Sequence, residues 1–366
     1  MRTEEVEFLC ERFRFEGTVT ETIQFGSGHI NDTFRVTTQT AEKERHYILQ
    51  RINNSIFAHP EQVMENVVGV TNFLQKKICK CGGNPERETL NIVLTKDGQS
   101  FYKMPDGNVW RAYLFIENAT AYDQVPNEDI FYQSAYAFGH FQRMLADYPA
   151  YQLFVTIPDF HNTVKRFSYF QSTIKENASG RLKNALDEVG FLLDNENISY
   201  ILLDRQEDGR LPLRVTHNDT KLNNVMIDND TGKAICVIDL DTVMPGLSAT
   251  DFGDAIRFGA STASEDEKDL RKVNFDLHLY EVYAKGFLAG CEGALTCAEI
   301  EMLPYGALVI TYEQALRFLS DYIAGDVYYK VAYPEHNLVR ARTQIKLVQQ
   351  MQANFRQMQD IISKNA

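Results

Sequence analysis

The sequence predicts an α+β protein with a small β-rich N-terminal part and a larger helical C-terminal part. Between residues 18 and 116, segments rich in Ile, Thr, Tyr and Phe alternate with turn residues. From Pro126 onward, apolar residues recur at helical spacing. The chain has 366 residues, which is more than a typical domain contains. We therefore expect two domains, at residues 1–117 and 118–366.

The N-terminal part is expected to be a mostly antiparallel sheet with one inserted helix. A short helix should open the chain at residues 3–15, where apolar residues recur at helical spacing. Pro60 begins a longer helix, because proline is favoured in a first helical turn, and Gly82-Gly83 ends it. The expected strands cover residues 18–25, 30–38, 45–52, 90–95, 100–104 and 109–116.

The C-terminal part is expected to be helical around one short β island near residues 213–240. The acidic run Glu265-Asp266-Glu267 is interpreted as a solvated first helical turn, where negative charge suits the helix dipole. The expected helices cover residues 127–147, 161–177, 181–205, 264–289, 296–323 and 336–362.

Composition and charge exclude several classes of protein. A hydrophobic content of 44% and a charged content of 24% are typical of a globular protein and not of a disordered chain. The formal charge of −13 disfavours a nucleic-acid or anionic-membrane partner. The six cysteines are scattered, the first residues have no signal-peptide pattern, and no apolar run has the length of a membrane span. We therefore expect a cytoplasmic protein.

The most informative stretch is a polar loop followed by an expected β-hairpin. Two apolar runs, at residues 224–228 and 233–239, flank a turn sequence at residues 229–232. With the turn centred between its last two residues, Asn224 lies directly opposite Asp239, close enough to share one cation. A glycine bulge in the turn would shift this register by one residue.

The residue types in this stretch suit phosphoryl transfer. The oxygens of Asn224 and Asp239 suit Mg²⁺, which keeps several waters and completes its shell with phosphates. Asp219 lies in the loop that enters the hairpin, where a carboxylate can accept a hydroxyl proton as that hydroxyl attacks a γ-phosphate. Lys221 can neutralise charge on the phosphoryl group, and His217 is interpreted as orienting the loop.

This stretch resembles the catalytic and metal segments of the protein-kinase-like superfamily. His217-Asn218-Asp219, followed by Asn224, is closer to the aminoglycoside phosphotransferases and choline kinases than to protein kinases. A narrower resemblance, to the N-acetylhexosamine 1-kinases, covers almost the whole chain. It rests on the blocks Gly26–Asn31, Tyr47–Arg51, Arg214–Asn224, Asp239–Gly246, Asp251–Ser261 and Tyr333–Arg340.

The resemblance implies a bilobal protein-kinase-like fold, with a small antiparallel β N-lobe and a larger helical C-lobe. It also implies an enzyme that uses ATP and Mg²⁺ to phosphorylate the anomeric (C1) hydroxyl of N-acetylglucosamine or N-acetylgalactosamine. Asp219 would then be the general base, and Asn224 and Asp239 would bind the metal. Gly26 and Gly28 would lie over the nucleotide phosphates. The connector would present backbone groups to adenine from Phe115, Ile116 and Glu117.

Four further residues are candidates for contact with the acceptor. Arg317 and Tyr328 resemble sugar-contacting positions of the hexosamine kinases, and a planar polar group beside an aromatic ring suits a sugar. His29 follows the glycine loop and could reach phosphate or sugar. Asp241 could ligate a second metal or the sugar, or it could form structural hydrogen bonds.

The chain departs from the wider kinase pattern in two places. Protein kinases place a lysine on the third strand to hold the phosphates, whereas Gln50 occupies that register here and Arg51 points to the other face. The metal aspartate, Asp239, is followed by Leu240 and not by Phe-Gly. An Asp-Phe-Gly sequence does occur at Asp251, and we interpret it as the start of a helix that packs beneath the site.

Two other functions stay open at the level of the sequence. The acceptor could be a different sugar, an amino alcohol or an aminoglycoside. Alternatively, Gln50 could mark a kinase-like protein that binds nucleotide without catalysis, although the intact set of Asp219, Asn224 and Asp239 argues against this. The sequence does not decide between gluco and galacto epimers, nor does it give the oligomeric state.

Overall fold

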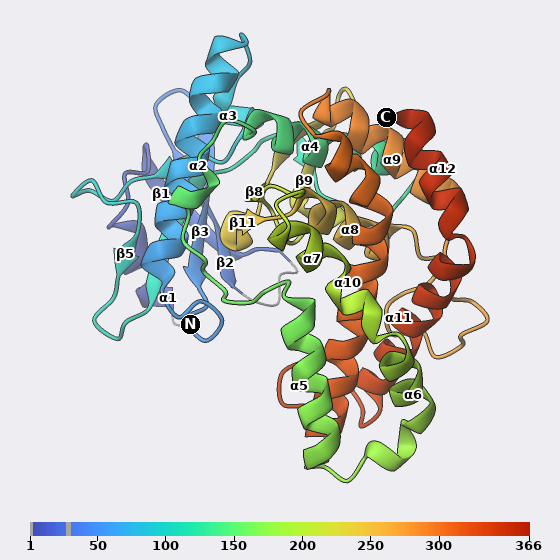
Figure 1. Ribbon diagram of the computed structural model, residues 1–366. Coiled ribbons are helices and arrows are strands. Elements are labelled where there is room, and N and C mark those ends of the chain that lie inside the picture. Colours follow the sequence, from blue (N-terminus) through green and yellow to red (C-terminus); the bar gives the residue numbers. More distant parts are fainter. Residues whose placement is uncertain (1–2, 27–30) are drawn as a thin grey trace. The chain divides into compact units, whose positions relative to one another are not determined.

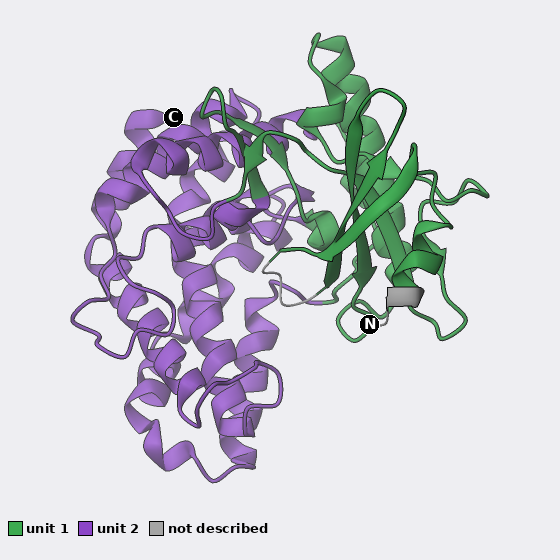
Figure 2. Ribbon diagram, turned by 180° about the vertical axis from the view of Figure 1, so that it is seen from behind, with its two compact units in different colours: residues 1–121, 147–158, 225–245 green, residues 122–146, 159–224, 246–366 purple. Residues whose placement is uncertain are grey.

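The computed structural model describes residues 3–26 and 31–366. They form an α+β protein with an antiparallel sheet in the N-terminal region and helices in the C-terminal region, which confirms the predicted fold class. The chain divides into two compact units, coloured separately in Figure 2. Unit 1 contains residues 1–121, 147–158 and 225–245, and unit 2 contains residues 122–146, 159–224 and 246–366.

Unit 1 is built around one antiparallel sheet whose strands follow the order β1-β2-β3-β6-β4, with β5 also paired to β6. The elements of this sheet and its helices are α1 (Thr3–Cys10), β1 (Thr18–Gln24), β2 (Asp32–Gln39), β3 (Glu44–Ile52), α2 (Pro60–Lys80), α3 (Pro85–Glu88), β4 (Ile92–Val93), β5 (Tyr102–Lys103) and β6 (Val109–Leu114). The expected strand order along the chain is therefore confirmed, with β4 and β5 shorter than predicted.

The two faces of this sheet carry different residues, because side chains alternate along a strand. Leu49 of β3 and Trp110 of β6 belong to a buried apolar cluster that also contains Leu9 of α1. Their neighbours Gln50 and Arg111 point to the opposite face and lie directly across from each other in the β3–β6 ladder. One face is thus an ordinary apolar core, and the other carries buried polar groups.

A second, three-stranded sheet of unit 1 has the order β10-β9-β7, with β7 (Ala119–Thr120), β9 (Val225–Asp228) and β10 (Ala234–Val237). The predicted register of this hairpin is wrong by one residue, because Val225 pairs with Val237 across a ladder that contains a bulge. The bulge lies in β10, between Ala234 and Cys236, and Gly232 in the turn has φ +66°. Neither Asn224 nor Asp239 belongs to the ladder.

Unit 2 is helical, and its helices surround α10, which has α5, α8 and α11 beside it (Figure 1). The helices are α4 (Glu128–Met144), α5 (Thr163–Glu176), α6 (Leu186–Asp194), α7 (Ile201–Glu207), α8 (Ser248–Gly259), α9 (Leu277–Cys291), α10 (Cys297–Ala324), α11 (His336–Ala353) and α12 (Phe355–Asn365). A short strand, β8 (Arg214–Thr216), also belongs to unit 2, and the strand β11 (Met244–Gly246) lies where the chain passes from unit 1 to unit 2. None of the described helices combines the length and apolarity that a membrane crossing requires.

Helices α8 and α10 approach each other backbone to backbone. A Cβ atom placed on Gly253 would lie 2.3 Å from the carbonyl oxygen of Gly306, and one on Gly306 would lie 1.9 Å from that of Ala249. Only glycine fits at such distances. This close crossing anchors α8, which carries the polar residues described below.

Four predicted helices differ from the structure. The helix expected at residues 3–15 ends at Cys10, and the helix expected at residues 336–362 is divided at Asn354 into α11 and α12. The segment expected as one helix at residues 181–205 is divided into α6 and α7 by a short 3₁₀ segment at Glu196–Tyr200. The helix expected from residue 264 begins only at Leu277, because the side chain of Asp276 accepts the N–H groups of His278 and Leu279 and so caps α9 there. The acidic run at 265–267 is therefore not a first helical turn.

Candidate functional site

The loop predicted to be catalytic lies in unit 2, between β8 and the 3₁₀ turn Leu222–Asn224. Its backbone is held by Asp251, whose two carboxylate oxygens accept the N–H groups of His217 at 2.9 Å and Asn218 at 2.8 Å. Gln142 of α4 donates to the same carboxylate at 2.7 Å. Asp251 is 1% exposed and lies in the first turn of α8. The interpretation of the Asp-Phe-Gly sequence as the start of a helix is thus confirmed.

His217 is fully buried and serves as a packing and hydrogen-bonding residue of this loop. Its ring forms edge contacts with Phe138 and Phe141, at centroid distances of 5.3 and 6.1 Å. Its Nδ1 atom accepts the backbone N–H of Asp219 at 3.3 Å. These contacts agree with a histidine that orients the loop.

Asp219, the predicted base, has a side chain that is 23% exposed. Lys221 Nζ lies 2.7 Å from its Oδ1 atom. Asn224 Nδ2 donates to the backbone oxygen of Asp219 at 2.8 Å and lies 3.3 Å from its Oδ2 atom. Burial disfavours the charge on Lys221, but the carboxylates of Asp219 and Asp254 outweigh burial and raise the pKa of this ammonium group. The structure therefore brings Asp219, Lys221 and Asn224 together.

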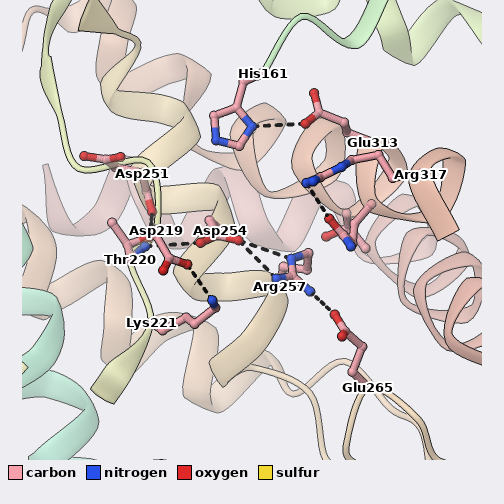
Figure 3. A network of polar contacts seen from close by, with 12 residues as sticks. His161, Asp219, Thr220, Lys221, Asp251, Asp254, Arg257, Glu265, Glu313 and Arg317 are labelled. Atoms are coloured by element: carbon pink, nitrogen blue, oxygen red, sulfur yellow. Dashed lines mark hydrogen bonds and ion pairs between the residues drawn. The ribbon is translucent and has the colours of Figure 1, made fainter. Parts of the chain in front are cut away.

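A network of charged residues surrounds this loop (Figure 3). Asp254 of α8 accepts the N–H of Thr220 at 3.1 Å and pairs with Arg257, one turn further along the helix, at 3.2 Å. Arg257 also pairs with Glu265 at 2.6 Å. Burial raises the pKa of the Asp254 carboxyl, but Arg257 and Lys221 outweigh burial and lower it. Each carboxylate of this group thus has a cationic partner.

A second branch of the network leads to Arg317. His161 Nδ1 lies 3.0 Å from Glu313 Oε1, and Thr163 donates to the other oxygen of Glu313 at 2.7 Å. The guanidinium of Arg317 lies 5.9 Å from the ring centroid of Tyr328, which is 66% exposed. The two residues expected to contact a sugar are therefore neighbours in the structure.

Sequence reasoning did not select His161, Asp254, Arg257 or Glu313. For Asp254 and Arg257 a signal exists, because they follow Asp251 at intervals of three residues and so share one face of a helix. His161 and Glu313 are far apart in the chain, and nothing in their local sequence brings them together.

Unit 1 carries the residues predicted for the nucleotide and one of the two predicted metal ligands, Asp239, whereas the other, Asn224, belongs to unit 2. Gly26 has φ +83°, a backbone conformation that favours glycine, whereas Gly28 and His29 lie outside the described residues. Asp239 also has a positive φ, of +57°, and precedes the 3₁₀ turn Leu240–Thr242. Gln50 and Asp241 both contact Arg111, at 2.6 and 2.5 Å.

The connector residues form a partly packed strand end. Phe115 forms an edge contact with Phe25 at 5.7 Å, and Ile116 is buried. Glu117 pairs with His46 at 2.8 Å, and its backbone oxygen accepts a hydrogen bond from Arg87 at 3.0 Å. The carbonyl of Glu117 is therefore already engaged within unit 1.

A separate cavity of about 500 Å³ opens in unit 2 among α7, α10 and α12. Tyr200, Arg205 and Tyr305 are among its lining residues. None of the predicted site residues that the structure describes lines this cavity.

Comparisons with known proteins give the family and the fold of this chain. Residues 21–284 match the model of the phosphotransferase enzyme family. An aminoglycoside phosphotransferase from Alicyclobacillus acidocaldarius is similar in structure, with a TM-score of 0.64, 14% identity, and coverage of 96% of this chain and 95% of that chain. A choline kinase from Cryptosporidium parvum gives a TM-score of 0.61 at 15% identity, over 100% of this chain and 99% of that chain.

A spectinomycin phosphotransferase, solved in complex with ADP and spectinomycin, gives a TM-score of 0.59 at 14% identity and covers 98% of this chain and 99% of that chain. At such identities these structures establish the fold, and the family match covers most of the chain, including the loop at residues 217–224 and α8. The chain therefore belongs to the phosphotransferase enzyme family, and its fold is that of aminoglycoside phosphotransferases and choline kinases.

Proposed function

We propose that this protein is an ATP- and Mg²⁺-dependent sugar 1-kinase that transfers the γ-phosphoryl group to the anomeric hydroxyl of an N-acetylhexosamine. The observation that carries the proposal is the set of contacts at Asp219, a partly exposed carboxylate beside Lys221 and Asn224 on a loop that Asp251 holds in place. A carboxylate in this setting can accept the proton of an attacking hydroxyl. Lys221 then offsets charge on the phosphoryl group.

The charges near Asp219 favour a neutral acceptor over a cationic one. The carboxylates of Asp254 and Glu313 are already paired with Arg257 and His161. Arg317 adds a further positive charge to this region. An amino alcohol or an aminoglycoside would bring its own cation next to these groups, and like charges repel at short range. A neutral sugar meets no such penalty, and it can use Arg317 and the ring of Tyr328 for hydrogen bonds and stacking.

The residues at hand also fit a magnesium ion. Asn224 uses its amide nitrogen toward Asp219, which turns its amide oxygen away from that contact. Asp239 supplies a carboxylate, so the two residues together offer one amide and one carboxylate oxygen, the donor types that Mg²⁺ prefers. In this proposal Asn224 and Asp239 hold the ion, which offsets charge on the phosphates when it is bound.

The test is a product analysis with a panel of acceptors. Purified protein with ATP and Mg²⁺ is incubated with N-acetylglucosamine, N-acetylgalactosamine, glucose, choline, ethanolamine or an aminoglycoside, and products are identified by NMR. We expect an N-acetylhexosamine 1-phosphate. A 6-phosphate, or faster turnover of a cationic acceptor, contradicts the proposed acceptor. Absence of ATP turnover with every acceptor favours the non-catalytic alternative that Gln50 raises.

The catalytic role is tested by Asp219→Asn, which removes the base and keeps the shape of the side chain. We expect kcat to fall by at least about 100-fold, the scale of general-base catalysis. Asp204→Asn on α7 is the matched control, because Asp204 is exposed and is no part of the network in Figure 3. Wild-type turnover in Asp219→Asn would contradict the proposal.

A further inference from the structure

Unit 1 contains a buried arginine, Arg111, on β6. In protein kinases the corresponding positive charge is a lysine on the third strand, where this chain has Gln50. We propose that Arg111 on β6 takes the place of the missing third-strand lysine, as a positioning residue that holds Asp241 and thereby the metal segment at residues 239–241. This inference rests on the proposed function, because it concerns how the chain binds a metal–nucleotide complex.

Gln50 and Arg111 form a matched pair across the β3–β6 ladder. Arg111 donates to Gln50 Oε1 through Nε at 3.0 Å and Nη2 at 2.6 Å. Gln50 Nε2 donates to Thr33 Oγ1 at 2.9 Å, which fixes the amide so that its oxygen faces the guanidinium. A lysine at position 50 would place a second cation against Arg111. Glutamine in this register therefore belongs with an arginine on the neighbouring strand.

Asp241 is the anionic partner of this arginine. Its Oδ1 atom lies 2.5 Å from Arg111 Nη2, and the two side chains are 4% and 1% exposed. Its Oδ2 atom accepts a hydrogen bond from Asn31 Nδ2 at 2.8 Å. Asn31 in turn accepts the backbone N–H of Asn53 at 3.0 Å. Both oxygens of Asp241 are thus engaged inside unit 1, which favours the structural role among those that the sequence left open for this residue.

The consequence concerns Asp239, two residues earlier. Asp239 and Asp241 belong to the same tight turn, in which Asp239 has a left-handed backbone and precedes the 3₁₀ segment that contains Asp241. A buried carboxylate held on one side by Arg111 and on the other by Asn31 leaves this turn little freedom. Arg111 therefore acts through Asp241 to fix the backbone that presents Asp239.

Binding of ADP, measured by isothermal titration calorimetry with and without Mg²⁺, tests this role without the acceptor. Arg111→Met should weaken binding of Mg·ADP by about tenfold or more, equivalent to about 1.4 kcal/mol, and should change metal-free ADP binding much less. Lys103→Met is the control, because Lys103 forms an ion pair of unit 1, with Glu61 at 2.6 Å, and neither residue is predicted to bind the nucleotide or the metal. Equal Mg·ADP affinity in Arg111→Met and wild type overturns the inference.

A double-mutant cycle guards against a merely structural effect. Removing one partner leaves the other charge buried and unpaired, so Arg111→Met and Asp241→Asn should each weaken Mg·ADP binding. The double variant should be no weaker than the worse single variant. Fully additive losses would show that the two residues act independently, against the inference. Failure of wild type to bind any nucleotide would overturn the proposed function as well, so the two failures are distinguishable.

Gln50→Lys provides a second test, because it adds a positive charge beside Arg111 and removes no charged side chain. The added ammonium should weaken Mg·ADP binding in the presence of Arg111, because two cations then meet in a buried place. In the Arg111→Met background the same lysine should restore part of the affinity. If Gln50→Lys strengthens binding while Arg111 is present, the lysine and not the arginine is the preferred cation, and the inference fails.

Discussion

The two units differ in how they hold the segments that carry predicted site residues. In unit 2, buried carboxylates accept backbone N–H groups of these segments. Asp251 holds His217 and Asn218, and Asp321 accepts the N–H groups of three successive residues, 327–329, at 2.8–2.9 Å. In unit 1, a buried arginine, Arg111, joins side chains to one another.

This difference determines which substitutions should disturb each unit. A carboxylate that accepts main-chain N–H groups does not depend on the identity of the residues it holds, because every residue except proline carries that donor. One acidic residue then suffices to fix a loop. The arginine of unit 1 requires a particular acceptor on each neighbouring side chain, so its effect depends on a set of residues that must change together.

We expect the largest effect from removing the carboxylate that holds the loop in unit 2. Asp251→Asn keeps the size of the side chain but offers only one acceptor oxygen to two N–H groups and turns an NH₂ group toward a donor. We expect the free energy of unfolding to fall by about 1–3 kcal/mol. Because the loop carries Asp219, we also expect kcat to fall by at least about tenfold. Urea unfolding and steady-state kinetics measure the two effects.

Asp187→Asn is the control for this variant, because Asp187 is exposed in the first turn of α6. A loss of stability in Asp251→Asn with unchanged kcat would show that the loop keeps its shape without this carboxylate. The claim that one buried carboxylate fixes a loop in unit 2 would then be wrong.

How much of this could be predicted from the sequence differs between the two units. The β-rich and helical parts follow from residue periodicity, and the spacing of Asp219 and Asn224 predicts a catalytic loop. The hairpin register could not be predicted, because the bulge lies within β10, between Ala234 and Cys236, where the apolar run has no distinct signal for an extra residue. The start of α9 was missed because the Asp276 cap outweighs the helical pattern upstream.

The buried partners were the hardest to predict, since they are joined only by the tertiary fold. His161 and Glu313 are separated by 152 positions, and Arg111 and Asp241 belong to segments that lie far apart in the sequence. One signal was available for Arg111, because it is the charged residue within the otherwise apolar strand Val109–Leu114. A charge in such a strand is rarely buried without a partner. The partner itself could not be named without the structure.

A smaller effect is expected on the pH dependence of stability, through the ion pair of His161 and Glu313 in unit 2. Burial disfavours the charge on His161, but Glu313 outweighs burial and raises the pKa of this imidazole above 6.5. A raised pKa in the folded state stabilises the fold below the unfolded pKa, and this contribution is lost as pH rises through the folded pKa. The difference in unfolding free energy between wild type and His161→Gln should therefore be largest near pH 6 and shrink toward pH 9.

His278→Gln is the control for the pH series, because its side chain is 63% exposed. Unfolding curves at several pH values measure both variants against wild type. The outcome that contradicts this prediction is a difference in unfolding free energy, between wild type and His161→Gln, that grows as pH rises. His161 would then be neutral in the folded protein, and the region near Asp219 would carry one positive charge fewer.

The smallest effect is expected at Tyr328, where a rigid backbone carries an exposed side chain. Asp321 accepts the N–H of Tyr328 at 2.8 Å, which fixes the backbone, and the exposed ring contacts the ring of Tyr329 at a centroid distance of 4.8 Å. Tyr328→Ala should leave the unfolding free energy almost unchanged, because the side chain loses little burial. The KM for the sugar should rise about fivefold, the scale of one lost ring contact of about 1 kcal/mol. Tyr328→Phe separates the ring from its hydroxyl: if stacking is the contribution, the phenylalanine variant keeps the wild-type KM. An unchanged KM in Tyr328→Ala would show that this residue does not contact the sugar, and Arg317 would be the remaining candidate of the two for that contact.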